Sequence, residues 1–319
     1  MKKIAYLTIK IFVSLGLMAF ILTKIDLSSL ISSLLAARLS LVFAAIACAY
    51  LAYALNTYKW QQLLKVLGSN VSYFRLFVVN FIGLFYALFL PTQVSGEIVK
   101  GVKLSKRERN ISISNIIASI TVDRITGLLA LTVLFFISLS FTSPLINKIQ
   151  FSLSALFLFG LILIFAVAVL NTQVADMCER LGQSIFKAKG LKRLKTPISS
   201  LWGSLKAYRN SRPGLGEAVI CSFVYQLLVT GATYFAACAL GIKVSFVGFI
   251  WIVAVISIAQ LLPISISGIG VREGIFVFLL KGYHIPSQDA LALSLAVFGI
   301  SILMGLTGGV MDIFKVGQQ

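Results

Sequence analysis

Two short segments of the sequence share a pattern whose chemistry suits anion binding. Residues 90–100 read Leu-Pro-Thr-Gln-Val-Ser-Gly-Glu-Ile-Val-Lys, and residues 262–272 read Leu-Pro-Ile-Ser-Ile-Ser-Gly-Ile-Gly-Val-Arg. Both follow the pattern Leu-Pro-x-x-x-Ser-Gly-x-x-x-basic, with a glutamate nearby. Proline ends a helix because it lacks an amide donor, and glycine allows a sharp turn. The pattern therefore predicts a broken helix at each place.

A helix that restarts after such a break directs unpaired amides and a partial positive charge at its surroundings, which favours an anion. The serine of each segment is expected to cap the outgoing helix, and the glycine beside it to complete an amide cradle. The basic residue about one turn later would add a full positive charge. The predicted anion-binding residues are Ser95, Gly96, Lys100, Ser267, Gly268 and Arg272.

Charged residues also lie inside apolar segments. A charge at mid-bilayer costs roughly 2.5–3.5 kcal/mol, so such residues usually serve a function. We expect the acidic ones to balance charge or carry protons, and Arg124 to pair with Asp123; the alternative is that the pairs only hold helices together. The predicted coupling residues are Glu97, Asp123, Arg124 and Glu273.

The elements that must position these residues are membrane helices. Of the 319 residues 59% are hydrophobic and only 12% are charged, about half the charge of a soluble domain. Apolar runs long enough to approach or cross a bilayer recur throughout. They fall at about 4–23, 40–57, 75–90, 111–141, 151–170, 215–240, 245–262 and 288–314. We predict an all-α polytopic membrane protein, with residues 1–319 forming one transmembrane domain.

Basic residues favour a particular topology. If 75–90 crossed the membrane fully, the basic residues of 103–109 would lie opposite those of 59–75, Lys59 included, against the rule that short cytoplasmic loops collect Lys and Arg. We therefore predict a re-entrant hairpin at about 75–110, and a second at about 245–282 entering from the other face. About six full spans and these two hairpins form an inverted repeat. Both termini and the basic loop at about 172–213 are expected in the cytoplasm, at the inner membrane.

Other features exclude some functions. The net charge of +18 comes from basic residues that flank apolar runs and set orientation, so no nucleic-acid partner is expected. Four scattered cysteines and one histidine predict neither a metal site nor another cofactor. The sequence leaves the oligomeric state open, a homo-oligomer included. In the last span, glycines predict close helix packing; they are Gly299, Gly305, Gly308 and Gly309.

Several of these motifs together resemble a known family. They are Tyr58-Lys59-Trp60 after the second span, Leu-Pro-x-x-x-Ser-Gly-Glu in the first break, Asp123-Arg124, and Ser267-Gly268-Ile269-Gly270-Val271-Arg272-Glu273 after Pro263. Over nearly its whole length, the chain is similar to the lysylphosphatidylglycerol synthase transmembrane-region family. The resemblance implies transbilayer movement of a lipid with a polar headgroup: aminoacyl-phosphatidylglycerol in two-domain members, lipid-linked sugars or other lipids in some stand-alone ones. The sequence ends at Gln319 without the aminoacyltransferase domain, so we expect it not to synthesise the lipid.

These observations favour a lipid flippase or scramblase that moves a lipid with an anionic or phosphate-containing headgroup, a phospholipid or a polyprenyl-phosphate-linked lipid. Membrane lipid is the expected partner, and we expect no enzymatic activity. No ATP-binding motif is present, so transport would use an ion gradient or downhill flow. Two alternatives stay open: a secondary transporter of a small soluble anion, and a membrane transferase acting on lipid-linked sugar.

Overall fold

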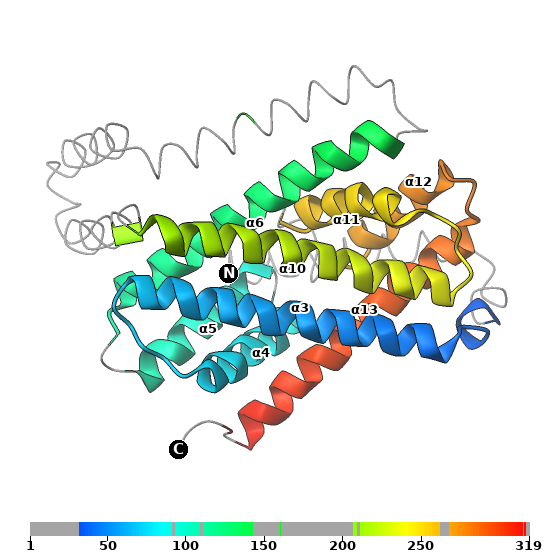
Figure 1. Cartoon of the computed structure of the whole chain (residues 1–319). Helices are drawn as coiled ribbons and strands as arrows, with labels where there is room; N and C mark the ends of the chain where they lie inside the picture. The colour runs from blue at the N-terminus through cyan, green and yellow to red at the C-terminus, as the bar shows by residue number, and fades with distance from the viewer. Residues whose placement is uncertain are drawn as a thin grey trace, which may run out of the picture.

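The regular structure of the chain is helical wherever it is described (Figure 1). The computed structural model describes residues 32–90, 93–108, 111–142, 160, 207–208, 211–261, 268–314 and 316. The helices are α3 (Leu39–Val66), α4 (Tyr73–Phe89), α5 (Gln93–Arg107), α6 (Ile113–Thr142), α10 (Arg212–Ala239), α11 (Phe246–Leu261), α12 (Val271–Lys281) and α13 (Ser287–Ile313). The predicted all-α class is confirmed for these residues.

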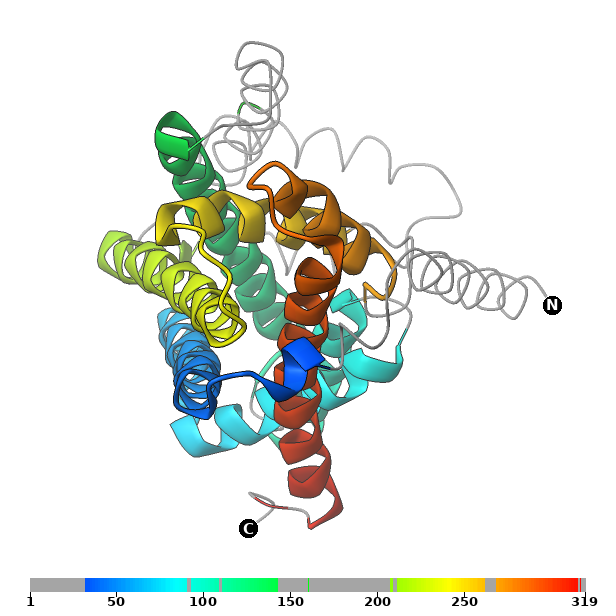
Figure 2. The same ribbon diagram turned by 90° about the vertical axis from the view of Figure 1, so that its right-hand side faces the viewer.

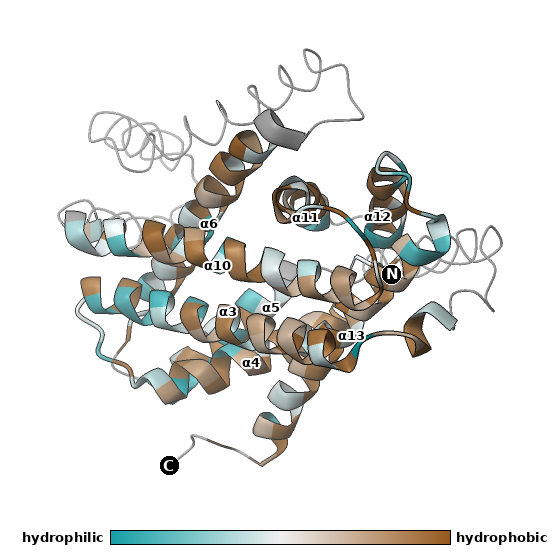
Figure 3. Cartoon of the chain, turned by 45° about the vertical axis from the view of Figure 1, so that its right-hand side comes forward, coloured by the Kyte–Doolittle hydropathy of each residue, from teal (hydrophilic) through white to brown (hydrophobic). Residues whose placement is uncertain are grey.

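Four of the described helices are long and apolar enough to cross a bilayer. They are Leu39–Val66, Ile113–Ser138, Pro213–Ala239 and Ser287–Ile313. They correspond to four of the six predicted spans; the spans at 4–23 and 151–170, and most of the loop at 172–213, lie outside the described residues. Hydrophobic residues predominate along α3, α6 and α10 (Figure 3). Large apolar side chains on the outside, such as Phe43 and Ile220, are exposed, as a lipid-facing surface requires.

Helices α3 and α10 pack side by side in antiparallel directions (Figure 1). The amide of Arg38, just before α3, donates to the carbonyl of Ala239 at the end of α10 at 3.0 Å. Toward the other end of the pair, the Tyr58 hydroxyl donates to Glu217 at 2.7 Å. Beyond α3 the chain turns at Gly68, whose φ of 73° favours glycine after a helix. Because the two helices are antiparallel, the C-terminal ends of α3 and α10 lie at opposite ends of the pair.

Helices α4 and α5 form an antiparallel hairpin. Arg75 near the start of α4 pairs with Glu108, just beyond the end of α5, at 2.7 Å. The two helices cross at Gly83 and Gly96, where a Cβ on Gly96 would lie 2.6 Å from the Gly83 carbonyl oxygen. Because α5 begins at Gln93, Ser95 lies within its first turn. The expectation that Ser95 caps this helix is therefore wrong.

Helices α11 and α12 form a second antiparallel hairpin. The Trp251 indole near the start of α11 donates to the Tyr283 hydroxyl beyond the end of α12, at 2.8 Å. Helix α12 begins at Val271, and the residue before it is Gly270, whose φ of 85° suits glycine. The predicted cap Ser267 is thus three residues too early, and Ser267 itself lies outside the described residues.

The two hairpins are based at opposite ends of the α3–α10 pair. Helix α4 follows the end of α3, and α11 follows the end of α10, so antiparallel packing separates their starts. Helix α13 contacts both hairpins, α12 along its first half and α4 along its second (Figure 2). This geometry is compatible with the predicted re-entrant hairpins and inverted repeat, which stay predictions.

The glycines of α13 allow it to approach α4 closely. A Cβ on Gly308 would overlap the Phe81 carbonyl, and one on Gly305 or Gly309 would overlap Leu88 or the Phe85 ring. Close packing is confirmed there, as membrane helices often use small residues in this way. At Gly299 the prediction is wrong, because a Cβ there would meet nothing within 4 Å.

This difference provides a matched pair of substitutions on one helix. Gly308→Ala is expected to destabilise the protein by roughly 1–3 kcal/mol, because backbone atoms of α4 cannot move aside cheaply. Gly299→Ala should leave stability unchanged or raise it slightly, since alanine is the better helix former. Thermal unfolding in detergent measures both. Equal melting temperatures for the two variants would contradict the packing described here.

Candidate functional site

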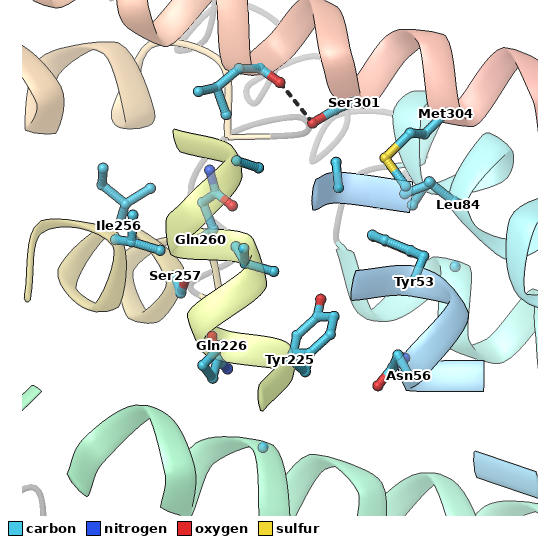
Figure 4. A pocket seen from close by; sticks show the side chains of 18 of the residues that line it. Tyr53, Asn56, Leu84, Tyr225, Gln226, Ile256, Ser257, Gln260, Ser301 and Met304 are labelled. Atoms are coloured by element: carbon cyan, nitrogen blue, oxygen red, sulfur yellow. Dashed lines mark hydrogen bonds between the residues drawn. The ribbon is translucent and has the colours of Figure 1, made fainter. Parts of the chain in front are cut away.

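A cavity of about 360 Å³ lies between the hairpins and the long helices, and every described helix from α3 to α6 and from α10 to α13 contributes to its lining. Figure 4 shows part of this lining, with Tyr53 and Asn56 on α3, Tyr225 and Gln226 on α10, and Ser301 and Met304 on α13. Its charged residues are Lys59, Glu97, Lys100, Asp123, Arg124 and Arg272. The cavity therefore collects charges from α3, α5, α6 and α12.

Glu97 bridges two basic side chains at the first hairpin. Its carboxylate lies 2.5 Å from the Lys100 ammonium and 2.9 Å from the Arg124 guanidinium. Residues three apart on a helix share a face, which explains why Glu97 and Lys100 meet on α5. Lys100 is almost fully buried, and its ammonium lies 4.4 Å from the centre of the Trp60 ring. One carboxylate thus compensates two cations, and the cluster keeps one net positive charge.

Lys59 and Asp123 form a separate buried ion pair. The ammonium lies 2.8 Å from the carboxylate and also donates to the Ser222 hydroxyl at 3.1 Å. The expectation that Asp123 pairs with Arg124 is therefore wrong: neighbouring residues on a helix do not face each other, and Arg124 pairs with Glu97 instead. The side chain of Lys59, which the predicted topology counts among the cytoplasmic basic residues, is buried in the cavity wall. The side of the membrane on which Lys59 lies stays a prediction.

The sequence contains a pattern that indicates burial of Lys59, but the aromatic residues beside it suggest a position at the membrane surface. An aromatic residue beside a base at the end of an apolar run is typical of the membrane surface. Helix α3 nevertheless continues to Val66, with Trp60, Leu63 and Leu64 buried at helical spacing. That apolar stripe beyond the run indicates that the helix stays packed against protein past Lys59.

Arg272 and Glu273 form the charged group of the second hairpin. Glu273 is completely buried; its carboxylate accepts hydrogen bonds from the Gly270 amide at 2.6 Å, from the Ser294 hydroxyl at 3.1 Å and from the Arg272 guanidinium. Arg272 also stacks on the Phe298 ring, 4.5 Å from its centre. The Glu273 carboxylate therefore caps the start of α12 and compensates the partial positive charge there.

The predicted site residues divide between the cavity and its surroundings. Those that line it are Gly96, Glu97, Lys100, Asp123, Arg124 and Arg272. Ser95 and Gly268 are not in the lining, Gly268 packs against the Gln260 side chain, and Glu273 lies behind Arg272. At the second hairpin, therefore, the Arg272 side chain and not an open helix start supplies positive charge to the cavity.

Electrostatics identify the cation best placed to meet a ligand. The three ion-paired groups contain four basic and three acidic residues, which leaves one net positive charge. The Arg124 side chain is 37% exposed, against 2% for Lys59 and for Lys100. A guanidinium has five donors, and Glu97 accepts from one nitrogen of Arg124. Arg124 can therefore hold a bound anion while Lys100 supports it from behind.

Spanning helices around a charged interior cavity define an integral multi-pass membrane protein with an internal polar site. The chain belongs to the lysylphosphatidylglycerol synthase TM region family, which it matches over residues 7–309. This confirms the resemblance seen in its motifs.

Similar proteins include three UPF0104 membrane proteins of archaea. One from Pyrococcus horikoshii is 26% identical over 275 residues, covering 77% of this chain and 79% of its own. One from Methanocaldococcus jannaschii is 27% identical, covering 62% of this chain and 80% of its own. A second from the same organism is 22% identical, covering 92% of this chain and 90% of its own.

Proposed function

We propose that this protein is a lipid flippase or scramblase that moves a lipid with a phosphate-containing headgroup across the inner membrane, and that it acts by transport and not by catalysis. The observation that carries the proposal is the positively charged Arg124–Glu97–Lys100 cluster, which lines a cavity shared by both hairpins. Membership of a family described by a lipid's name supports a lipid-related role.

The lengths of the hairpin helices support re-entrance. Helix α4 has 17 residues and α5 has 15, about 25 Å and 22 Å at 1.5 Å per residue. Helices α11 and α12 have 16 and 11 residues. All are shorter than the roughly 20 residues that span a bilayer. With bases at opposite ends of the α3–α10 pair, each hairpin would enter from its own face and end near mid-depth.

The cavity could carry a phosphate through the membrane interior. A phosphate accepts several hydrogen bonds at once from a guanidinium, and Arg124 offers such donors toward the cavity. Arg272, on the second hairpin, lines the same cavity and would be a second contact for the headgroup. The acyl or prenyl tails would stay in lipid while the headgroup passes. Paired charges around the path reduce the cost of placing them in the membrane.

The basic residues indicate how the protein is oriented in the membrane. Lys65, Arg75, Lys103 and Lys106 lie toward the base of the α4–α5 hairpin. By the rule that cytoplasmic loops collect basic residues, this end would face the cytoplasm, and we propose the same side for both chain termini.

Reconstitution tests the proposal. Proteoliposomes containing tail-labelled fluorescent phosphatidylglycerol report headgroup movement when a membrane-impermeant reductant bleaches the outer leaflet. Wild-type protein is expected to move the lipid at least about tenfold faster than protein-free vesicles, and Arg124→Gln to lose most of this gain, since a charged hydrogen bond is worth about 1.5–3 kcal/mol.

The matched control is Arg38→Gln, which removes an exposed arginine outside the cavity. It should move the lipid at the wild-type rate. A wild-type rate for Arg124→Gln, in protein that has retained its melting temperature, would refute the phosphate path.

A further inference from the structure

The cavity wall between α3, α10 and α11 carries uncharged polar side chains that can form hydrogen bonds. We call it the polar wall: Tyr53, Asn56, Tyr225, Gln226 and Ser257. All five line the cavity and are half-buried. Within the part of the chain that the structure describes, none of these side chains makes a hydrogen bond to another residue. Polar groups inside a membrane protein need partners, so the polar wall is built for water or a polar ligand.

The polar wall adjoins the charged cluster. The rings of Tyr53 and Tyr225 extend toward one another across the α3–α10 boundary, with centroids 6.5 Å apart (Figure 4). The Lys59 ammonium lies 5.9 Å from the centre of the Tyr225 ring, which joins the polar wall to the Lys59–Asp123 pair. A phosphate on Arg124 would therefore have the rest of its headgroup beside hydroxyl and amide groups.

The charges of the lining oppose a cationic headgroup. Two carboxylates line the described cavity, Glu97 and Asp123, and basic side chains already hold both. An ammonium group in the headgroup would meet four lining cations and no carboxylate left without a partner. Specificity often comes from such repulsion as much as from attraction. Hydroxyl groups, in contrast, can both donate to and accept from phenols, amides and serine.

We infer that the transported headgroup joins its phosphate to an uncharged, hydroxyl-rich group such as glycerol or a sugar, and that amine-bearing headgroups bind less tightly. This inference rests on the proposed function, whose phosphate site it extends by a second subsite. Arg124 and Lys100 hold the phosphate, and the polar wall selects the group attached to it.

Binding of short-chain lipids to the detergent-solubilised protein tests this specificity by calorimetry. Dihexanoyl phosphatidylglycerol and phosphatidylethanolamine carry headgroups of similar size, one with hydroxyls and one with an amine; phosphatidic acid carries the phosphate alone. Wild-type protein is expected to bind phosphatidylglycerol about tenfold more tightly than phosphatidylethanolamine, as two or three net hydrogen bonds would give. Equal affinities for these two lipids would overturn the inference.

A substitution of nearly equal size sharpens the test. Gln226→Glu places an uncompensated carboxylate in the polar wall and should reverse the preference, so that phosphatidylethanolamine binds more tightly than phosphatidylglycerol. Gln226→Leu should lower phosphatidylglycerol affinity toward that of phosphatidic acid and leave phosphatidic acid binding unchanged. An unaltered preference in both variants would contradict a role for the polar wall.

Phosphatidic acid binding by Arg124→Gln separates a failure of the proposed function from a failure of this inference. If Arg124→Gln binds phosphatidic acid as tightly as wild type does, the phosphate site is wrong whatever the headgroup preference. If phosphatidic acid binding depends on Arg124 but headgroups are not distinguished, only the inference about the polar wall falls.

Discussion

Lys59→Met is expected to lower the stability of the folded protein by about 3–5 kcal/mol. The substitution keeps the length and apolar stem of the side chain but leaves the buried Asp123 carboxylate without the ammonium 2.8 Å away. Breaking a buried ion pair on one side costs this much because a charge stays in a medium of low dielectric. Thermal and chemical unfolding in detergent would measure the loss.

Two further variants separate this effect from a general disturbance of α3. Lys59→Met/Asp123→Leu removes both charges and should recover most of the stability, since an apolar pair of similar volume can replace a buried ion pair. Lys65→Met changes an exposed lysine on the same helix and should have little effect. If the double variant is no more stable than Lys59→Met, the ion pair is not the cause of the loss.

Glu97→Gln is expected to strengthen phosphate binding about tenfold. Glu97 occupies the two cations that a ligand phosphate would use, so it acts as an internal anion in competition with the substrate. Glutamine keeps the size but loses the charge, which frees Lys100 and Arg124; a charged hydrogen bond is worth about 1.5–3 kcal/mol. Calorimetric titration with dihexanoyl phosphatidic acid at low salt would measure the gain.

Glu108→Gln is the matched control. Glu108 also pairs with an arginine, Arg75, but at the base of the same hairpin and outside the cavity lining. It should bind phosphatidic acid as wild type does. Weaker binding by Glu97→Gln would mean that Glu97 positions the two cations instead of competing with the ligand.

The sequence predicted where the two antiparallel helix pairs would form, because the cause is local; their re-entrance stays a prediction. Proline and glycine act on the backbone where they stand, so the breaks near residues 91 and 263 could be seen without tertiary structure. The charged residues of the cavity were also predictable as a set, because charges in apolar segments are costly wherever they lie. Glu97 and Lys100 pair because residues three apart share one face of α5. Arg272 and Glu273 pair within the first turn of α12, where Glu273 also accepts from the Gly270 amide.

Partners distant in sequence could not be predicted. Lys59 meets Asp123 only because α3 packs beside α6, and Arg124 meets Glu97 only because α5 packs there too. The predictions of Ser95 and Ser267 as helix caps were wrong for a similar reason. Serine is a good cap by propensity, but at α12 the buried Glu273 reaches back to the Gly270 amide and starts the helix later.

The membrane depth of the two hairpin tips tests the re-entrant topology most directly. Spin labels can be placed on single cysteines at Phe89 and Ile269, next to the tips, in protein whose four native cysteines have been replaced. Labels at Phe74 and Phe278, both exposed, mark positions near the hairpin bases. The accessibility of each label to oxygen and to a water-soluble nickel complex gives its depth. We predict that both tips lie near the bilayer centre and both bases near the headgroups; a tip at headgroup depth would contradict the re-entrant hairpins.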